Sequence, residues 1–202
     1  MNRSFLIYVG VLFTVVFSLS GLVLVPDWQF RGVEPYKLED GSAYPQPLTG
    51  PPEAGREVYI DLGCVYCHTQ QVRPNGFGAD IDRGWGNRRT VMRDYLYEPK
   101  NLLGTMRTGP DLANIGARQP STDWHYLHLY NPRITSPGSN MPPHPFLFET
   151  GDDLSRKPTA GISLPTEWQS GSVKYIVPTD RARYLVDYLR SLNKRVDLPE
   201  AE

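Results

Sequence analysis

The residues best suited to chemistry stand together at positions 63–68, in the run GCVYCH, which contains both cysteines of the sequence. Two thiols spaced Cys-x-x-Cys and followed directly by histidine form the attachment motif of a c-type haem. Each thiol adds to one vinyl group of the porphyrin, and the two-residue spacer lets a single turn of chain reach both groups. The motif therefore predicts one covalently bound haem c, held by Cys64 and Cys67, with His68 as an axial iron ligand.

A Cys-x-x-Cys pair also occurs in thioredoxin-like redox sites, in zinc sites and in small disulfide loops. A thioredoxin-like pair needs a surrounding βαβ pattern, and the sequence does not show one. A zinc site needs two further ligands, but the remaining histidines, His125, His128 and His144, lie far downstream. The immediate histidine favours haem, and a haem-free thiol oxidoreductase stays open as the alternative from another functional class.

Length and composition set the broad class of the protein. The 202 residues are enough for one domain with an appendage. The 21 basic and 22 acidic residues balance, so no nucleic-acid partner is expected. The 18 glycines and 19 prolines indicate long ordered loops, between which a covalent haem supplies core that side chains do not. Haem c is attached on the outer side of bacterial-type energy-coupling membranes. The motif therefore also predicts that this part of the chain lies on that outer side.

The chain begins with an uncharged run, Ser4–Val25, that predicts a membrane-spanning helix. At ~1.5 Å per residue such a helix is long enough for a bilayer core of about 30 Å. The run exceeds the ~7–15 apolar residues of a signal peptide, which favours a retained anchor over a cleaved leader. Arg3 predicts that the N-terminus lies inside and the rest of the chain outside. We expect an anchor over residues 1–26, a linker over 27–50 and the haem domain over 51–202.

Two predicted helices frame this domain as they do in class I cytochromes c, which the domain resembles. The first, over residues 51–63, carries apolar residues at Ala54, Val58 and Leu62 and leads directly into the haem motif. The last, over residues 179–194, has the clearest apolar face in the chain. The expected fold is mainly α, with one N-terminal transmembrane helix followed by a class I cytochrome c-like domain with long loop insertions.

Two further segments resemble landmarks of class I cytochromes c. The run GPDL at residues 109–112 resembles their G-P-x-L segment, in which the proline carbonyl accepts a hydrogen bond from the axial histidine. The resemblance gives Pro110 this role toward His68, with a simple turn as the alternative. Met141, in the proline-rich loop 133–144, resembles the methionine that binds iron from the opposite face. Met106 and a downstream histidine stay open as alternatives to Met141.

The remaining stretches are rich in glycine, proline and charge. Residues 69–108 are predicted to be an insertion with at most one short helix, and residues 149–178 are predicted to be loop-like. Arginines of the insertion are candidates to pair with haem carboxylates, although a solvated charged surface is the simpler interpretation for each alone. They are Arg88, Arg89, Arg93 and Arg107.

Nearly the whole chain resembles the mono-haem cytochrome c subunit, subunit II, of cbb3-type cytochrome c oxidases. The run GREVYIDLGCVYCHTQQVRP is close to the haem segment of that subunit, and the long insertion and tail match it as well. The resemblance implies a complex in a bacterial inner membrane, with the haem domain in the periplasm. Its partners would be a catalytic subunit with b-type haem and copper and a di-haem cytochrome c subunit.

The resemblance also implies a function. The complex would reduce O2 to water and pump protons, while this chain, as a non-catalytic subunit, passes electrons from its haem c to the b-type haem. An iron with histidine and methionine ligands is coordinatively full, so it changes redox state without binding O2. Two alternatives stay open: the mono-haem c subunit of a nitric-oxide reductase, and a membrane-tethered thiol oxidoreductase that uses Cys64 and Cys67.

Overall fold

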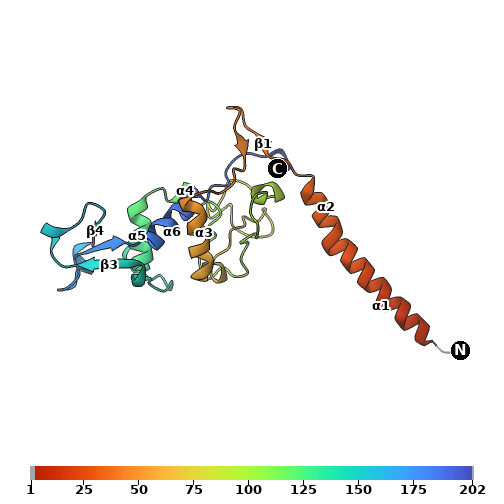
Figure 1. Ribbon diagram of the computed structural model, residues 1–202, viewed down its shortest axis with the longest axis horizontal. Coiled ribbons are helices and arrows are strands. Elements are labelled where there is room, and N and C mark those ends of the chain that lie inside the picture. Colours follow the sequence, from red (N-terminus) through yellow and green to blue (C-terminus); the bar gives the residue numbers. More distant parts are fainter. Residues whose placement is uncertain (1–2, 202) are drawn as a thin grey trace. The chain divides into compact units, whose positions relative to one another are not determined.

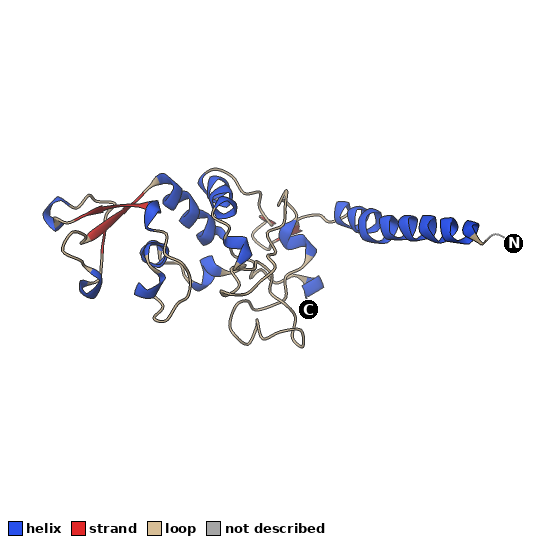
Figure 2. Cartoon of the chain, turned by 90° about the horizontal axis from the view of Figure 1, so that it is seen from below, coloured by secondary structure: helices blue, strands red, loops and turns tan. Residues whose placement is uncertain are grey.

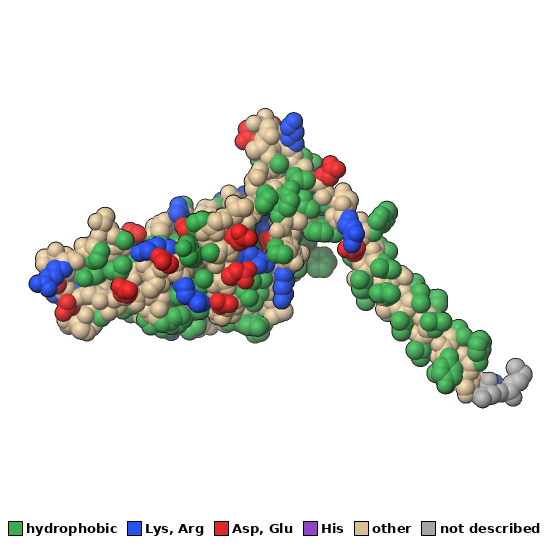
Figure 3. Space-filling model, in the orientation of Figure 1, with side chains coloured by type: hydrophobic (Ala, Val, Ile, Leu, Met, Phe, Trp, Pro, Cys, Tyr) green, Lys and Arg blue, Asp and Glu red, His purple; other side chains and the backbone are tan. Residues whose placement is uncertain are grey.

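The longest helix begins near the N-terminus (Figure 1). The structure is a computed structural model that describes residues 3–201. Helix α1 (Ser4–Leu19), a π-helical turn (Ser20–Leu24) and helix α2 (Val25–Arg31) form one continuous helix of 28 residues. As the sequence predicts, it is long and apolar enough to cross a membrane. Hydrophobic side chains follow its length in Figure 3.

This helix continues past Val25, into the segment expected to be linker. Pro26 has no amide hydrogen for the carbonyl of Leu22, and the π-helical turn that contains Leu22 absorbs this break in the hydrogen-bond ladder. An ion pair between Arg31 Nε and Asp27 Oδ2, 2.9 Å apart, then supports the last turn.

The described residues divide into two compact units. One contains the residues up to Gln46 together with Val91–Tyr97, and the other contains Pro47–Thr90 and the residues from Glu98 onward. In the first unit, strand β1 (Tyr36–Lys37) pairs antiparallel with strand β2 (Ala43–Tyr44). The 3-10 turn Met92–Tyr95 belongs to the same unit.

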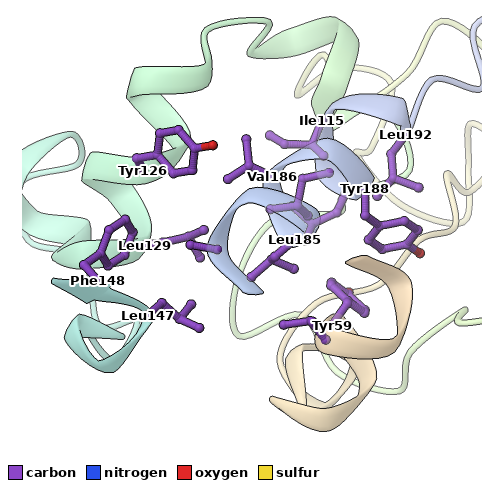
Figure 4. Close-up of a cluster of buried hydrophobic side chains, with 14 of the residues drawn as sticks. Tyr59, Ile115, Tyr126, Leu129, Leu147, Phe148, Leu185, Val186, Tyr188 and Leu192 are labelled. Atoms are coloured by element: carbon purple, nitrogen blue, oxygen red, sulfur yellow. The ribbon is translucent and has the colours of Figure 1, made fainter. Parts of the chain in front are cut away.

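Two helices that are far apart in the sequence form the centre of the second unit. Helix α3 (Pro51–Asp61) packs against helix α6 (Asp180–Ser191), as Figure 1 shows. The ring of Tyr59 meets the ring of Tyr188 edge-on, with 5.4 Å between their centres. Figure 4 shows side chains of α6 in the middle of the core, between Tyr59 on one side and Tyr126 on the other. This packing closes the domain around the residues that follow α3.

Two short helices complete the helical part of the second unit. They are α4 (Ile115–Arg118) and α5 (Thr122–Tyr130), the latter capped by the Ser121 side chain. The 3-10 turns of the chain are Cys64–Tyr66, Met92–Tyr95, Pro132–Ile134, Pro145–Leu147, Leu154–Arg156, Thr166–Trp168 and Pro199–Ala201. The protein is therefore mainly α, with little strand.

The prediction that residues 149–178 are loop-like is only partly right. They contribute to a three-stranded antiparallel sheet in the order β3 (Phe148–Gly151), β5 (Tyr175–Pro178), β4 (Ile162–Ser163), coloured red in Figure 2. The strands are too short to show alternation, and they are separated by glycine- and proline-containing turns. Their pairing depends instead on distant contacts, such as the ring of Phe148 against Tyr130 of α5, 5.7 Å between centres.

Candidate functional site

A cavity of about 540 Å³ lies inside the second unit. This volume is in the range of cofactor and small-molecule sites, about 300–1,000 Å³. Cys64, Cys67, His68 and Met141 all line it. Much of the remaining wall is apolar and comes from α3, α5, α6 and the segment around α4: Tyr59, Leu112, Ile115, Leu129, Leu185 and Leu189. The cavity thus brings together four residues that stand up to 77 positions apart, from 64 to 141.

The two cysteines lie on a tight turn directly after α3. Gly63 ends the helix with φ of 71°, a left-handed conformation that favours glycine. The amides of Cys67 and His68 then both donate to the Cys64 carbonyl, at 3.1 and 3.0 Å. Both cysteines are free thiols, and burial raises the pKa of Cys64 to about 11. The local backbone therefore presents two free thiols and a histidine within a single turn.

His68 is held by a residue that lies 42 positions downstream. Its Nδ1 donates to the carbonyl oxygen of Pro110 at 2.7 Å, which leaves Nε2 as the nitrogen with a free lone pair. Burial lowers the pKa of His68 below its usual 6.5, so the neutral form that binds metals is favoured. A Cβ on Gly109 would lie 2.2 Å from His68 Cε1, so the imidazole ring packs directly on that glycine.

Met141 lies on a loop that is tied to α5 at both ends. Near its start, His128 Nδ1 and Thr135 Oγ1 are 2.6 Å apart. At its end, the amide of His144 donates to the Leu129 carbonyl at 2.9 Å. Among the methionines within residues 3–201, Met141 alone lines the cavity. The alternative Met106 is 59% exposed, so the geometry favours Met141.

Histidines, which the sequence left open as alternatives to Met141, also line the cavity. His128 stacks on Trp124 at 4.6 Å between ring centres, and His125 meets the same ring edge-on. Burial, followed by the neighbouring histidines, lowers the pKa of His128 to about 4. The His125 Nε2 donates to the Gln119 carbonyl at 2.8 Å, which occupies that nitrogen.

The arginine that lines the cavity is not one of the four named from the sequence. Arg118 of α4 donates to the Asp111 carbonyl, and its buried Nε has no hydrogen-bond partner. By contrast, Arg88 and Arg89 bind backbone carbonyls of the C-terminal tail, and Arg107 binds Asp80. Sequence analysis missed Arg118 because it lies outside the arginine-rich insertion, on a helix too short to show a pattern.

The donors that line the cavity fit a haem. Two free thiols and a neutral imidazole lie on one turn, a thioether lies on the Met141 loop, and the apolar walls suit a porphyrin ring. The unpartnered Arg118 Nε is a donor suited to a carboxylate. Each chemical part of a c-type haem therefore has a matching residue in this cavity.

Comparison with protein families shows to which family the chain belongs. Residues 2–167 match the family model described as cytochrome c oxidase, mono-heme subunit/FixO. The chain belongs to the FixO family. The match agrees with the mono-haem oxidase subunit suggested by the haem segment, and it implies one haem and a place in an oxidase complex with a catalytic subunit. A comparison with curated proteins found no match.

The part that matches the FixO family contains the features from which the site is built. It spans the apolar helix, the turn with Cys64 and Cys67, the Pro110 segment and the Met141 loop. Helix α6, which supplies Leu185 and Leu189 to the cavity wall, follows the matched residues.

Proposed function

We propose that this FixO-family chain is the electron-transfer subunit of a cbb3-type oxidase and that its second unit is a class I cytochrome c-like domain. The observation that carries the proposal is the joint lining of one cavity by Cys64, Cys67, His68 and Met141. The 2.7 Å hydrogen bond from His68 to the Pro110 carbonyl adds the partner that an iron-binding histidine needs.

Each residue has a defined part in holding the cofactor. Cys64 and Cys67 would hold haem c through two thioether bonds. His68 and Met141 would bind its iron, and Pro110 keeps the His68 ring in one tautomer and orientation. The buried Nε of Arg118 would pair with a haem carboxylate. When bound, the haem supplies a centre that accepts and releases one electron at a time.

The residues limit the chemistry to electron transfer. If both His68 and Met141 bind the iron, it would have no position open for O2. The apolar walls, including Leu185 and Leu189, suit the porphyrin ring and disfavour water beside it. The chain therefore passes electrons to the b-type haem of the catalytic subunit, which reduces O2 to water and pumps protons.

The helix Ser4–Arg31 sets the location. It anchors the chain as a single span in a bacterial inner membrane, with Arg3 on the cytoplasmic side and the haem unit in the periplasm. A tether of this kind keeps the haem unit at a high effective concentration near the catalytic subunit and a di-haem cytochrome c subunit.

The two alternatives meet specific difficulties. A thiol oxidoreductase needs a cysteine with a lowered pKa, whereas burial raises that of Cys64 to about 11, so its thiol stays protonated at neutral pH. A nitric-oxide reductase subunit has the same plan of anchor and haem, but the matching family model describes a subunit of cytochrome c oxidase.

Purification of the chain from its native membrane tests the proposal. A pyridine haemochrome spectrum should show one haem c per chain, and acid-acetone should not remove it. Cys64→Ala and Cys67→Ala should each strongly impair attachment, while Tyr66→Phe, on the exposed residue between them, should not. The purified complex should reduce O2 rather than NO. A haem-free chain, or haem that acid-acetone extracts, would overturn the proposal.

A further inference from the structure

Two buried carboxylates of the second unit are not among the residues that line the cavity. Asp80 and Asp111 are both 0% exposed, and each is fully hydrogen-bonded. Asp111 follows Pro110, and Asp80 lies in the insertion after the haem motif. Buried charge that is so well paired usually maintains a particular geometry, so the contacts of these two residues are informative.

Asp111 connects the chain on both sides of the His68–Pro110 hydrogen bond. Its Oδ2 accepts from Thr69 Oγ1 and from the Gln71 amide, both at 2.7 Å. Its Oδ1 accepts from the Ala113 amide at 2.8 Å. One carboxylate therefore holds the residues after His68 against the residues after Pro110.

Backbone hydrogen bonds reinforce the same junction. The Gly109 amide donates to the Cys67 carbonyl at 3.0 Å, and the Leu112 amide donates to the Thr69 carbonyl at 2.8 Å. The His68–Pro110 bond thus lies between two backbone bonds and next to the Asp111 carboxylate, so its length depends on how firmly this junction is held.

Arg107, at the end of the insertion, links the junction to Asp80 and Trp85 earlier in the insertion. Its Nε donates to Thr69 Oγ1 at 2.9 Å, its Nη1 binds Asp80, and its guanidinium carbon lies 5.5 Å from the centre of the Trp85 ring. Thr69 therefore accepts from Arg107 and donates to Asp111 through one hydroxyl. The chain of contacts runs from Asp80 through Arg107 and Thr69 to Asp111. Arg107 Nη2 also lies 3.8 Å from Asp111 Oδ2, so the two side chains form a direct ion pair as well.

We propose that Asp80, Arg107, Thr69 and Asp111 are positioning residues that hold the Pro110 carbonyl against His68 and thereby set the donor strength of its imidazole toward iron. In this arrangement the insertion 69–108 has a role of its own, because it supplies Asp80 and Trp85, which fix Arg107. The inference rests on the proposed function, because it concerns the iron ligand His68. A stronger Nδ1–H bond makes His68 a better donor and stabilises ferric iron.

Substitution of Thr69 tests this without changing charge. Thr69→Val removes the hydroxyl that hydrogen-bonds both Arg107 and Asp111 and leaves only the longer 3.8 Å ion pair between those two residues. Thr69→Ser keeps the hydroxyl. The readouts are the reduction potential and the solvent exchange of the His68 Nδ1 proton, followed by nuclear magnetic resonance on the full haem-loaded chain with labelled histidine. The chain has only four histidines, so this signal is assignable.

We expect Thr69→Val to raise the reduction potential and to speed exchange roughly 3- to 10-fold, the change that corresponds to one weakened hydrogen bond. Thr69→Ser should behave like the wild type. If Thr69→Val binds haem but keeps the wild-type exchange rate of the His68 Nδ1 proton and the wild-type reduction potential, the inference is overturned. The proposed function would then stay intact. A wild-type chain without haem would overturn both.

A second pair of variants decides the matter if Thr69→Val does not bind haem. Asp80→Asn weakens the hold on Arg107, and Asp82→Asn makes the same charge change at an exposed position of the same insertion. The inference requires faster exchange of the His68 Nδ1 proton in Asp80→Asn only. Equal exchange rates in the two variants would overturn it.

Discussion

Gly55 of α3 lies in backbone contact with Tyr184 of α6: a Cβ at Gly55 would stand 1.8 Å from the Tyr184 carbonyl oxygen. That oxygen belongs to the backbone, so it cannot move aside as a flexible side chain does. The close approach brings Tyr59 onto Tyr188 and closes the cavity wall formed by Leu185 and Leu189. The turn with Cys64 and Cys67 follows α3 directly. The crossing of the two helices therefore also fixes where that turn lies.

We therefore predict that Gly55→Ala destabilises the second unit. Forcing a methyl group into this contact should cost about 1–3 kcal/mol of unfolding free energy, as overpacking does elsewhere. Thermal unfolding of the purified chain, followed by haem absorption, measures the loss. Gly171→Ala serves as the control, because a Cβ there meets nothing within 4 Å. Equal unfolding temperatures for the two variants would contradict the backbone contact.

Axial ligation by Met141 gives a second prediction. A thioether ligand raises the reduction potential relative to a second histidine, so Met141→His should lower the potential and abolish the methionine–iron charge-transfer band. Optical redox titration measures both effects. Met106→Leu is the matched control, since Met106 is exposed and should leave the band unchanged. If the band instead survives in Met141→Leu and vanishes in Met106→Leu, Met106 is the ligand.

Local signals explain why the sequence could name residues that the fold brings together. The haem motif, the Pro110 segment and the Met141 loop are short patterns of residue types, and one cavity contains all three. The helix before the motif was also predicted, and Val58 of its expected apolar stripe is buried, but one residue of that stripe is not. Ala54 is exposed, whereas Tyr59 is 1% exposed. Periodicity alone did not reveal that the neighbouring glycine meets α6.

Contacts between distant segments explain what the sequence did not predict. The sheet β3-β5-β4 pairs Glu149 with Val177, across turns of no regular length, so no short window contains its signal. Arg118 enters the cavity because α4 follows the Pro110 segment, and four residues are too few to establish a helical period. The Asp80–Arg107 pair could not be predicted from the sequence either, because the two residues stand 27 positions apart and no short pattern contains both.

The loss of stability at acid pH should reveal the lowered pKa of Asp80. Burial opposes ionisation of this carboxyl, but hydrogen bonds from Arg73 and Arg107 outweigh it and lower the pKa from 3.8 to about 2. A lowered carboxyl pKa contributes stability above the unfolded pKa, and this contribution is lost as pH falls through the folded pKa. The wild type should therefore lose on the order of 2 kcal/mol between about pH 4 and about pH 2.

Denaturant unfolding at several pH values measures this contribution. Asp80→Asn should be less stable than the wild type at neutral pH, and the difference should shrink as pH falls from about 4 to about 2. Asp82→Asn, which changes an exposed carboxyl, should not show this convergence. A stability difference between wild type and Asp80→Asn that stays constant over this range would show that the Asp80 pKa is not lowered.

The membrane helix gives the last prediction. Electron transfer requires the haem edge to lie close to its acceptor, and a soluble domain reaches that position only by collision. As a membrane anchor, the helix Ser4–Arg31 would make the encounter effectively intramolecular. Replacing it with a cleavable signal peptide should still give soluble, haem-loaded protein, because the haem site lies wholly within the second unit. That protein should assemble poorly with its partners and support little oxidase turnover at native abundance. Full turnover by the soluble form, or a mature N-terminus near Gly21, would show that the helix is not a retained docking anchor.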